Sequence, residues 1–335
     1  MKKATINDVA DLAGVSIKTV SRVLNHEPKV RPATQERVQK AMKLLDYSPN
    51  SSARRLAGRR SYLLGLLYDN PGMSYITHIQ NGALEACRQD HYDIMIFPSN
   101  FGDPGLPGQI REMLNDVRVD GVLLTPPICD TESVRRELRA LSASNVVVSP
   151  GGEIGKRWAV LTNDHEMCLK MVNHLADHGH KRIAFVKGDP EHLAVVKRYE
   201  GYLDGMRSRG LAIDPSLTVQ GFNHFESGVV CGEQLLARDN PPTAIFCATD
   251  DMAAGVMRVA HEKGMLIPSD LSVAGFDDAP LAGQTWPALT TIRQPLHDMG
   301  HEAARLLINR IRGVTTEDTT CVIESELIVR NLSLI

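Results

Sequence analysis

The chain has 335 residues, 43% hydrophobic and 23% charged, so it is long enough for two or three globular domains with substantial cores. These proportions exclude a collagen-like chain, a long coiled coil and a wholly disordered protein. No apolar stretch approaches the length of a membrane span. The six cysteines are scattered without a C-x-x-C pair, which is typical of a reducing compartment. We therefore expect a cytoplasmic protein with no membrane partner.

Charge is distributed unevenly along the chain. The formal net charge is −3, yet the first 60 residues carry 13 Lys and Arg against 5 Asp and Glu. A basic segment on an acidic body indicates a polyanionic partner for that segment, although a solvated basic tail has the same charge. The apolar residues favour a folded head, because their spacing can build a small core: Val9, Leu12, Val15, Val20, Val23, Leu24, Val38, Met42 and Leu45.

Start and stop signals divide this head into three helices. Thr5 with Asp8 forms a capping-box pattern, and Gly14 ends the first helix. Ser16 can cap a second helix, and a third is expected at 33–45. Two short helices joined by a turn that contains glycine are typical of a helix-turn-helix. A helical hairpin without a nucleic-acid partner has the same pattern.

The segments TINDVA (5–10), AGVS (13–16) and TVSRVLN (19–25), with YSPN (47–50) and ARRL (53–56), resemble the DNA-binding head of the lactose/galactose repressor family. The resemblance extends through the body and covers essentially the whole chain. It implies an all-α helix-turn-helix head at 1–49 that binds double-stranded DNA, and a hinge helix at 50–60 that folds on specific DNA.

Carried over by position, the resemblance implies that Ile17, Lys18 and Arg22 read base edges in the major groove. It places Leu56 as a wedge in the minor groove, although a plain linker leucine is the alternative. The remaining residues of the implied interface would hold phosphates or line the grooves: Thr5, Ser16, Thr19, Ser21, Asn25, Asn50 and Ala53.

The body, 61–335, alternates short apolar strands with helices. Strands are expected at 63–68, 92–97, 121–125, 145–149, 159–162, 183–186, 217–220, 244–248 and 272–276, and helices at 75–90, 106–117 and 131–142. Fully apolar strands between helices indicate parallel, doubly wound α/β sheets. The length exceeds one such domain, so two lobes are expected.

Body motifs extend the family resemblance: GHKRI (179–183), Arg198 with GY (201–202), VAGFDD (273–278) and Pro287 with LTTI (289–292). They imply the fold of periplasmic sugar-binding proteins, with lobe crossings near Leu161, Thr291 and Val322. The N-lobe would comprise 61–161 and 292–321, and the C-lobe 162–291 and 322–335.

The crevice between two such lobes is a natural site for a small ligand. Arg198 and Asp277 match family positions that face it, and their charges suit hydroxyl recognition, although a structural salt bridge is the alternative for each. Asp250 is expected to cap the following helix. Few aromatic residues fall at these positions, which favours a sugar over a planar purine. The other expected effector contacts are Asp69, Tyr75, Ser149, Asn223 and Thr249.

Enzyme signatures are missing from the sequence. His178 and His180 have no third metal ligand at a recognisable spacing, and a turn entering a strand explains them within the family pattern. The glycines before Lys156 are one residue too close for a phosphate-binding loop, and Arg157 follows where Ser or Thr is needed. We therefore expect neither an enzyme nor a cofactor or metal.

The resemblance predicts a sequence-specific transcriptional regulator, a repressor of carbohydrate-utilisation genes. A homodimer would bind a pseudo-palindromic operator, and a sugar-like effector between the lobes would control operator affinity allosterically. Induction and co-repression both occur in the family, so the sign stays open. The absence of a sustained heptad tail favours a dimer over a tetramer. The rival hypothesis is a sugar-binding or enzymatic body whose basic head is incidental.

Overall fold

A computed structural model describes residues 4–24, 30–47, 60–69, 72–152, 154–155, 157–314 and 319–330. The chain separates into two units, Met1–Tyr62 and Leu63–Ile335, each with its own internal contacts. Within the described residues, no helix is both long and apolar enough to cross a membrane.

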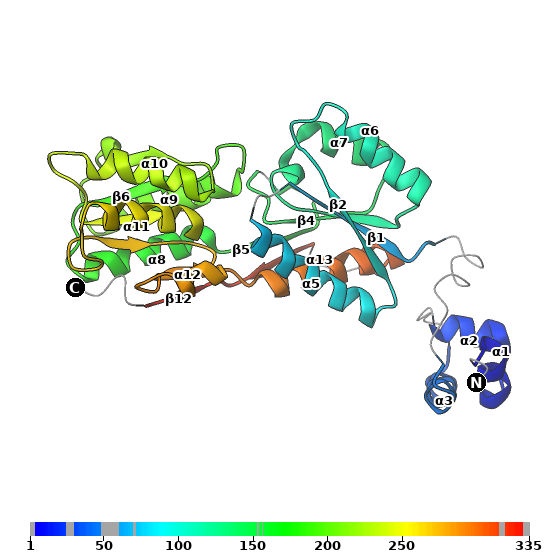
Figure 1. Cartoon of the computed structure of the whole chain (residues 1–335). Coiled ribbons are helices and arrows are strands. Elements are labelled where there is room, and N and C mark those ends of the chain that lie inside the picture. The colour runs from blue at the N-terminus through cyan, green and yellow to red at the C-terminus, as the bar shows by residue number, and fades with distance from the viewer. Residues whose placement is uncertain are drawn as a thin grey trace. The chain divides into compact units, whose positions relative to one another are not determined.

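The first unit holds three helices, α1 (Ile6–Ala13), α2 (Ile17–Leu24) and α3 (Pro32–Leu44) (Figure 1). The capping box at α1 is confirmed, because the Thr5 hydroxyl accepts from the Asp8 N–H and the Asp8 carboxylate accepts from the Thr5 N–H. Gly14 ends α1 with φ 63°, a conformation that suits glycine. The Ser16 hydroxyl accepts from the Thr19 N–H at 3.2 Å. The helix-turn-helix is therefore formed by the local signals that predicted it.

The head has a core of aliphatic side chains from all three helices. Val9, Val20 and Val38 are fully buried, and Met42 and Leu45 are partly buried beside them. The expectation that Leu12 belongs to this core is wrong, because its side chain is 52% exposed. The buried face of α1 is formed by Val9, Ala10 and Ala13, and Leu12 lies beyond the edge of that face.

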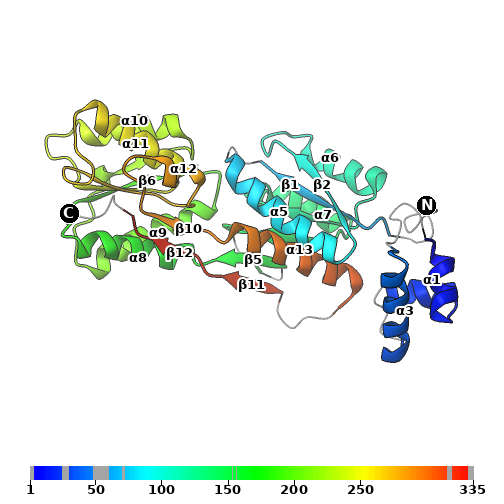
Figure 2. The ribbon, with the colours of Figure 1, turned by 60° about the horizontal axis from the view of Figure 1, so that its bottom comes forward.

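The first lobe of the body is a six-stranded parallel sheet in the order β11-β5-β4-β3-β1-β2. Helices α5 and α13 pack together on one face of the sheet, and α6 and α7 lie on the other (Figures 1 and 2). The strands are β1 (Leu63–Tyr68), β2 (Asp93–Pro98), β3 (Gly121–Leu124), β4 (Asn145–Val148), β5 (Ala159–Thr162) and β11 (Thr320–Ile323). The helices are α5 (Met73–Gln89), α6 (Leu106–Glu112), α7 (Glu132–Ala140) and α13 (Leu296–Arg312).

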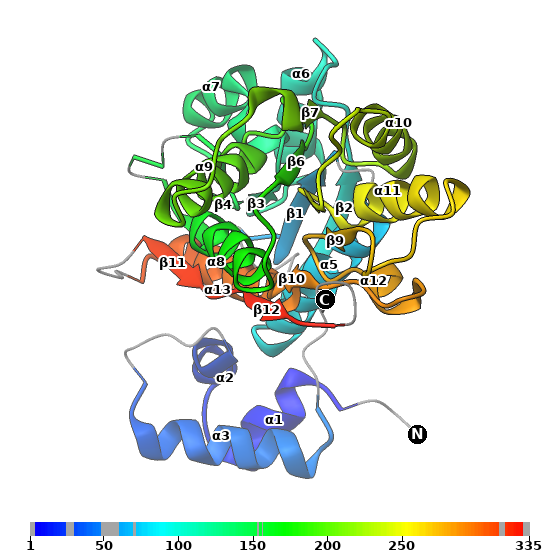
Figure 3. The same cartoon turned by 90° about the vertical axis from the view of Figure 1, so that its left-hand side faces the viewer.

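The second lobe holds a four-stranded parallel sheet in the order β7-β6-β8-β9. Two pairs of packed helices flank it, α8 with α9 and α10 with α11 (Figure 3). The strands are β6 (Ile183–Lys187), β7 (Thr218–Gln220), β8 (Ala244–Cys247) and β9 (Ser272–Ala274). The helices are α8 (Asp164–Asp177), α9 (Ala194–Ser208), α10 (Phe225–Leu236), α11 (Asp250–Glu262) and the short α12 (Pro280–Gln284).

The chain passes three times between the lobes. It crosses after β5, after β10 (Thr291–Arg293) and between β11 and β12 (Glu326–Ile328), just beyond the expected positions in each case. Strands β10 and β12 pair antiparallel. Each lobe is therefore built from segments that are far apart in the sequence, and the carboxyl ends of the strands in both sheets can meet at the crevice.

Candidate functional site

The outer face of α2 carries the three residues that were expected to read bases. Ile17 is 49% exposed, and Lys18 and Arg22 are exposed beside it, while Val20 and Val23 point into the head core. Residues at i, i+1, i+4 and i+5 share one face of a helix, so this face is continuous. It presents one apolar and two cationic side chains, a combination suited to a thymine methyl group and to guanine acceptors.

Hydroxyl groups gather at the amino ends of α1 and α2, where backbone N–H groups favour anions. Thr5 is exposed at the start of α1, and the Ser16 and Thr19 hydroxyls lie 2.9 Å apart at the start of α2. Ser21 is half-buried on α2. The other four expected DNA contacts lie outside the described residues and stay predictions: Asn25, Asn50, Ala53 and Leu56.

A cavity of about 70 Å³ lies in the body unit, and both lobes line it. Tyr75 and Ser149 come from the first lobe. Six of the seven expected effector residues line the cavity: Tyr75, Ser149, Arg198, Asn223, Thr249 and Asp277. The seventh, Asp69, is not among the lining residues, and its carboxylate accepts a hydrogen bond from the Phe101 N–H at 2.8 Å in the loop after β2.

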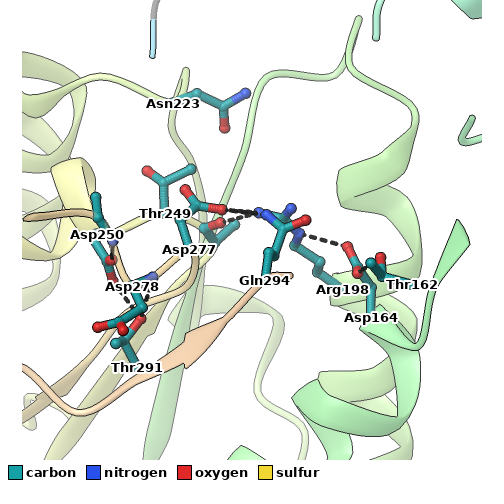
Figure 4. A network of polar contacts seen from close by, with 12 residues as sticks. Thr162, Asp164, Arg198, Asn223, Thr249, Asp250, Asp277, Asp278, Thr291 and Gln294 are labelled. Carbon is teal, nitrogen blue, oxygen red and sulfur yellow. Dashed lines mark hydrogen bonds and ion pairs between the residues drawn. The ribbon is translucent and has the colours of Figure 1, made fainter. Parts of the chain in front are cut away.

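Arg198 is buried on α9, with only 7% of its surface exposed. Its Nε donates to Asp164 at 3.0 Å, and its Nη1 donates to the Ala248 carbonyl at 2.6 Å and to Asp277 at 3.5 Å (Figure 4). The guanidinium carbon lies 3.7 Å from the centre of the Phe276 ring, a cation–π contact. Arg198 is thus a structural ion-pair partner and a cavity residue at once. Its Nη2 donates to none of the described residues, which leaves this group for a ligand.

Asp277 is held at the cavity wall by contacts from two sides. Gln294 donates at 2.7 Å to the same carboxylate oxygen that Arg198 contacts, and the Asp277 N–H donates to the Ile292 carbonyl at 2.8 Å. Burial raises the pKa of Asp277 to about 6, against the lowering effect of the Arg198 charge. The residue adopts φ 117°, which is unusual for a side chain other than glycine.

Two more cavity residues share this backbone feature. Ser149 and Asn223 adopt φ 46° and 62°, and each follows the carboxyl end of a strand. Residues in this region are strained by about 1–3 kcal/mol, and such strain concentrates at functional sites.

The expectation that Asp250 caps α11 is wrong. Thr249 is the cap, because its hydroxyl accepts from the Met252 N–H at 3.3 Å. Asp250 instead accepts from the Thr291 hydroxyl at 2.6 Å and from the Ala279 N–H at 2.8 Å (Figure 4). Burial raises its pKa well above the ordinary value. Asp250 therefore ties α11 to β10 and to the segment before α12.

Sequence reasoning missed three polar residues that line the cavity, namely Asp251, His192 and Gln294. Asp251 is half-buried, and no described side chain pairs with its carboxylate. Burial raises the pKa of Asp251, as does the nearby Glu226 charge, whereas burial lowers the pKa of His192. The pair Asp250-Asp251 after a strand was the available signal, but only the helix geometry decides which carboxylate faces the cavity.

His180 lies outside this cavity and is buried at the amino-terminal end of the strands of the second sheet. Its two ring nitrogens lie 3.0 Å from the Thr243 hydroxyl and 2.9 Å from the Ser272 hydroxyl. Both nitrogens are therefore occupied by structural contacts. Among the residues that the structure describes, no cluster of three His, Cys, Asp or Glu side chains is placed to hold a metal.

Two family models match the chain. One describes bacterial regulatory proteins of the lacI family and covers residues 5–50, and the other describes a periplasmic binding protein-like domain and covers residues 172–331. The first corresponds to the head. The second covers most of the second lobe and also includes α13 and β11 of the first lobe.

Similar proteins span the whole chain. The HTH-type transcriptional repressor PurR of Vibrio atlanticus (strain LGP32) is 32% identical and aligns over 98% of both proteins, and catabolite control protein A of Priestia megaterium is 33% identical over 94% of this chain and 95% of its own. Among solved structures, a transcriptional regulator CelR–cellobiose complex has a TM-score of 0.76 at 30% identity and covers 98% of this chain and 99% of its own. A lac repressor dimer bound to operator and the anti-inducer ONPF has a TM-score of 0.73 at 26% identity over both full chains.

The head and the body thus match one architecture over their full length. The chain belongs to the lacI family of bacterial regulatory proteins and is a DNA-binding transcriptional regulator.

Proposed function

We propose that the chain is a cytoplasmic repressor of carbohydrate-utilisation genes, and that a sugar-like effector in the cavity controls its affinity for a pseudo-palindromic operator. The observation that carries this proposal is the polar cavity, which combines one guanidinium, two carboxylates and several hydroxyl and amide groups from two lobes. A ligand rich in hydroxyls can donate to the carboxylates and accept from Arg198 simultaneously.

The charges of the cavity favour a neutral ligand. Arg198 already contacts Asp164 and Asp277, and Asp251 adds a carboxylate that has no described partner. A phosphate or carboxylate on the ligand would face this surplus of negative charge. Among the described lining residues, Tyr75 is the only Phe, Tyr or Trp. A planar base could therefore not be held between two such side chains.

The similar structures are consistent with this chemistry. One of them is a complex with cellobiose, and another holds ONPF and operator together. A sugar in this chain would bridge the lobes, because Tyr75 and Ser149 belong to the first lobe and Arg198, Asn223 and Asp277 to the second. It would stabilise one angle between the lobes over others, and that angle would set operator affinity through the linker to the head.

A homodimer completes the proposal. Two heads related by a two-fold axis match two half-sites of a pseudo-palindrome. In each head Lys18 and Arg22 would donate to guanine and Ile17 would contact a thymine methyl. Phosphate contacts at the amino ends of α1 and α2 would set the register.

Selection of bound duplexes from a random pool tests the DNA-binding part of the proposal. The wild-type chain should enrich a pseudo-palindrome, and Arg22→Ala should weaken binding by about 1–3 kcal/mol and relax the preference at one position of each half-site. Arg37→Ala on α3, an exposed cation of the same head, is the control. If no site is enriched and binding collapses uniformly with salt, the rival hypothesis of an incidental basic head holds instead.

A further inference from the structure

A second cavity lies on the outer face of the first lobe, away from the cavity between the lobes. Its volume is about 350 Å³, and its floor includes Leu124, Leu138 and Val147. The other crossovers on this face of the sheet are helical, but β4 and β5 are joined by a loop. The sheet surface beside α7 therefore lacks a covering helix, which leaves this hollow.

Four guanidinium groups line the hollow, those of Arg135, Arg139, Arg157 and Arg310. Arg135 and Arg139 share Glu132, each at 2.8 Å. Arg157 lies 3.7 Å from Asp130, whose carboxylate also accepts from the Gly151 N–H at 2.8 Å and the Gly152 N–H at 3.2 Å. Both carboxylates are thus divided among several donors.

Arg310 contacts no carboxylate of the described chain. It reaches from α13 to the Asn145 carbonyl at 2.8 Å, and its guanidinium lies 5.6 Å from the centre of the Trp158 ring. Burial lowers the pKa of Arg310, and no described carboxylate offsets this effect. In addition, the Nε atom of Arg135 is buried without a hydrogen-bond partner. A buried donor left in this way is costly unless an acceptor completes it.

We propose that this cavity binds a small organic anion whose phosphate or carboxylate group meets Arg310, Arg139 and Arg135 while its apolar part covers the floor. The site is separate from the cavity between the lobes and goes beyond the proposed function. Guanidinium groups suit such anions because each can donate two parallel hydrogen bonds.

The two cavities share one structural link. The loop after β4 begins at Ser149, which lines the cavity between the lobes, and ends at Arg157, which lines the cationic cavity. Asp130 holds the middle of this loop through Gly151 and Gly152. An anion that draws Arg157 away from Asp130 would act on the same loop.

Titration calorimetry of the full chain with phenyl phosphate tests the proposal, with inorganic phosphate and phenol as partial probes. We expect saturable binding of phenyl phosphate, weaker binding of inorganic phosphate and none of phenol. Arg310→Gln and Arg139→Gln should each lower the affinity for phenyl phosphate about tenfold or more, since each substitution removes a charge-assisted contact. Arg258→Gln on α11 removes an exposed arginine of the other lobe and should change nothing.

Arg139 provides the safer variant, because its side chain is 64% exposed and its replacement should leave the fold intact even if Arg310→Gln unfolds the lobe. The proposal is overturned if phenyl phosphate gives no saturable heat, or if wild type and Arg139→Gln bind it equally. It is also overturned if the variants lose operator affinity while phenyl phosphate fails to bind, since the arginines would then contact the DNA backbone.

Discussion

Arg198 contacts Asp164, Ala248 and Asp277 at once, so its removal affects the fold as well as the ligand. Replacement by alanine leaves two carboxylates without their cation at a largely buried position. We expect Arg198→Ala to abolish effector binding and to lower the free energy of unfolding by about 3–5 kcal/mol. Urea unfolding of the variant measures this loss. An unchanged midpoint would mean that the ion pairs contribute nothing to the fold.

Asp251 allows a cleaner test of the cavity, because no described side chain depends on its carboxylate. Asp251→Asn should weaken the binding of a neutral sugar about tenfold, as expected for the loss of one charged hydrogen-bond acceptor, without lowering the unfolding midpoint. Asp239→Asn, an exposed carboxylate of the same lobe, is the matched control. Calorimetric titration with the effector compares the three proteins, and equal affinities would remove Asp251 from the site.

Asp277 predicts a pH dependence of effector binding. Its pKa is raised to about 6, so it holds its proton more tightly in the folded chain, and the stability gained from protonation is lost as pH rises through 6. Ligand hydroxyls donate to the ionised carboxylate, so affinity should rise with pH and level off above 6. We expect binding about tenfold weaker at pH 5 than at pH 7.

The control for this pH profile is Asp277→Asn, which should bind more weakly at neutral pH but respond less to pH. Some dependence should remain, because burial also raises the pKa of Asp251 in the same cavity. A wild-type affinity that stays constant from pH 5 to pH 7 would contradict the assignment of Asp277 as an acceptor for the ligand.

The sequence predicted well which segments of the chain reach the cavity. It predicted less well which individual side chains face the cavity. Arg198 and Asp277 follow from family motifs, and six of seven expected residues line the cavity. Asp69 does not line it, and its carboxylate accepts a hydrogen bond from the Phe101 N–H, 32 positions away in sequence. The cap of α11 was wrongly assigned to Asp250, because the Thr249 hydroxyl makes the capping contact and Asp250 instead contacts Thr291 on β10.

At the scale of elements, α10 and α11 pack through glycine. A Cβ atom on Gly228 would lie 2.2 Å from the Met252 carbonyl oxygen, so the two helix backbones have no room for it. Gly228→Ala should lower the free energy of unfolding by about 1–3 kcal/mol through overpacking. Gly108→Ala on α6 meets nothing within 4 Å and should stabilise by about 0.5–1 kcal/mol. Urea unfolding distinguishes the two, and equal shifts would contradict the close packing.

Helices whose ends depend on local signals were predicted well. Thr5, Asp8 and Gly14 delimit α1 through contacts within a few residues. The helix expected at 106–117 was only partly correct, because α6 ends at Glu112 and a π-helical turn, Met113–Val117, follows before Arg118 at φ 59°. Met113 of that turn is buried in the core of the first lobe, and such tertiary packing is not encoded in helix periodicity.

At the scale of the whole molecule, alternating strands and helices predicted two parallel sheets, since a doubly wound fold follows from that rhythm. The order of strands did not follow, because β5 and β11 pair across about half of the chain. The three crossings were placed through family resemblance. What periodicity cannot supply is the contact between segments that are distant in sequence, and the cavity is built from such contacts.

The central claim is that a ligand in the cavity changes the affinity of the heads for an operator. The test is fluorescence anisotropy of the selected duplex, measured with and without each member of a sugar panel, for the wild-type chain and for Asp251→Asn. We predict that one sugar shifts wild-type operator affinity by about 5–150-fold and that Asp251→Asn needs a higher concentration of it for the same shift. A sugar that binds the body calorimetrically yet leaves operator affinity unchanged would contradict the account.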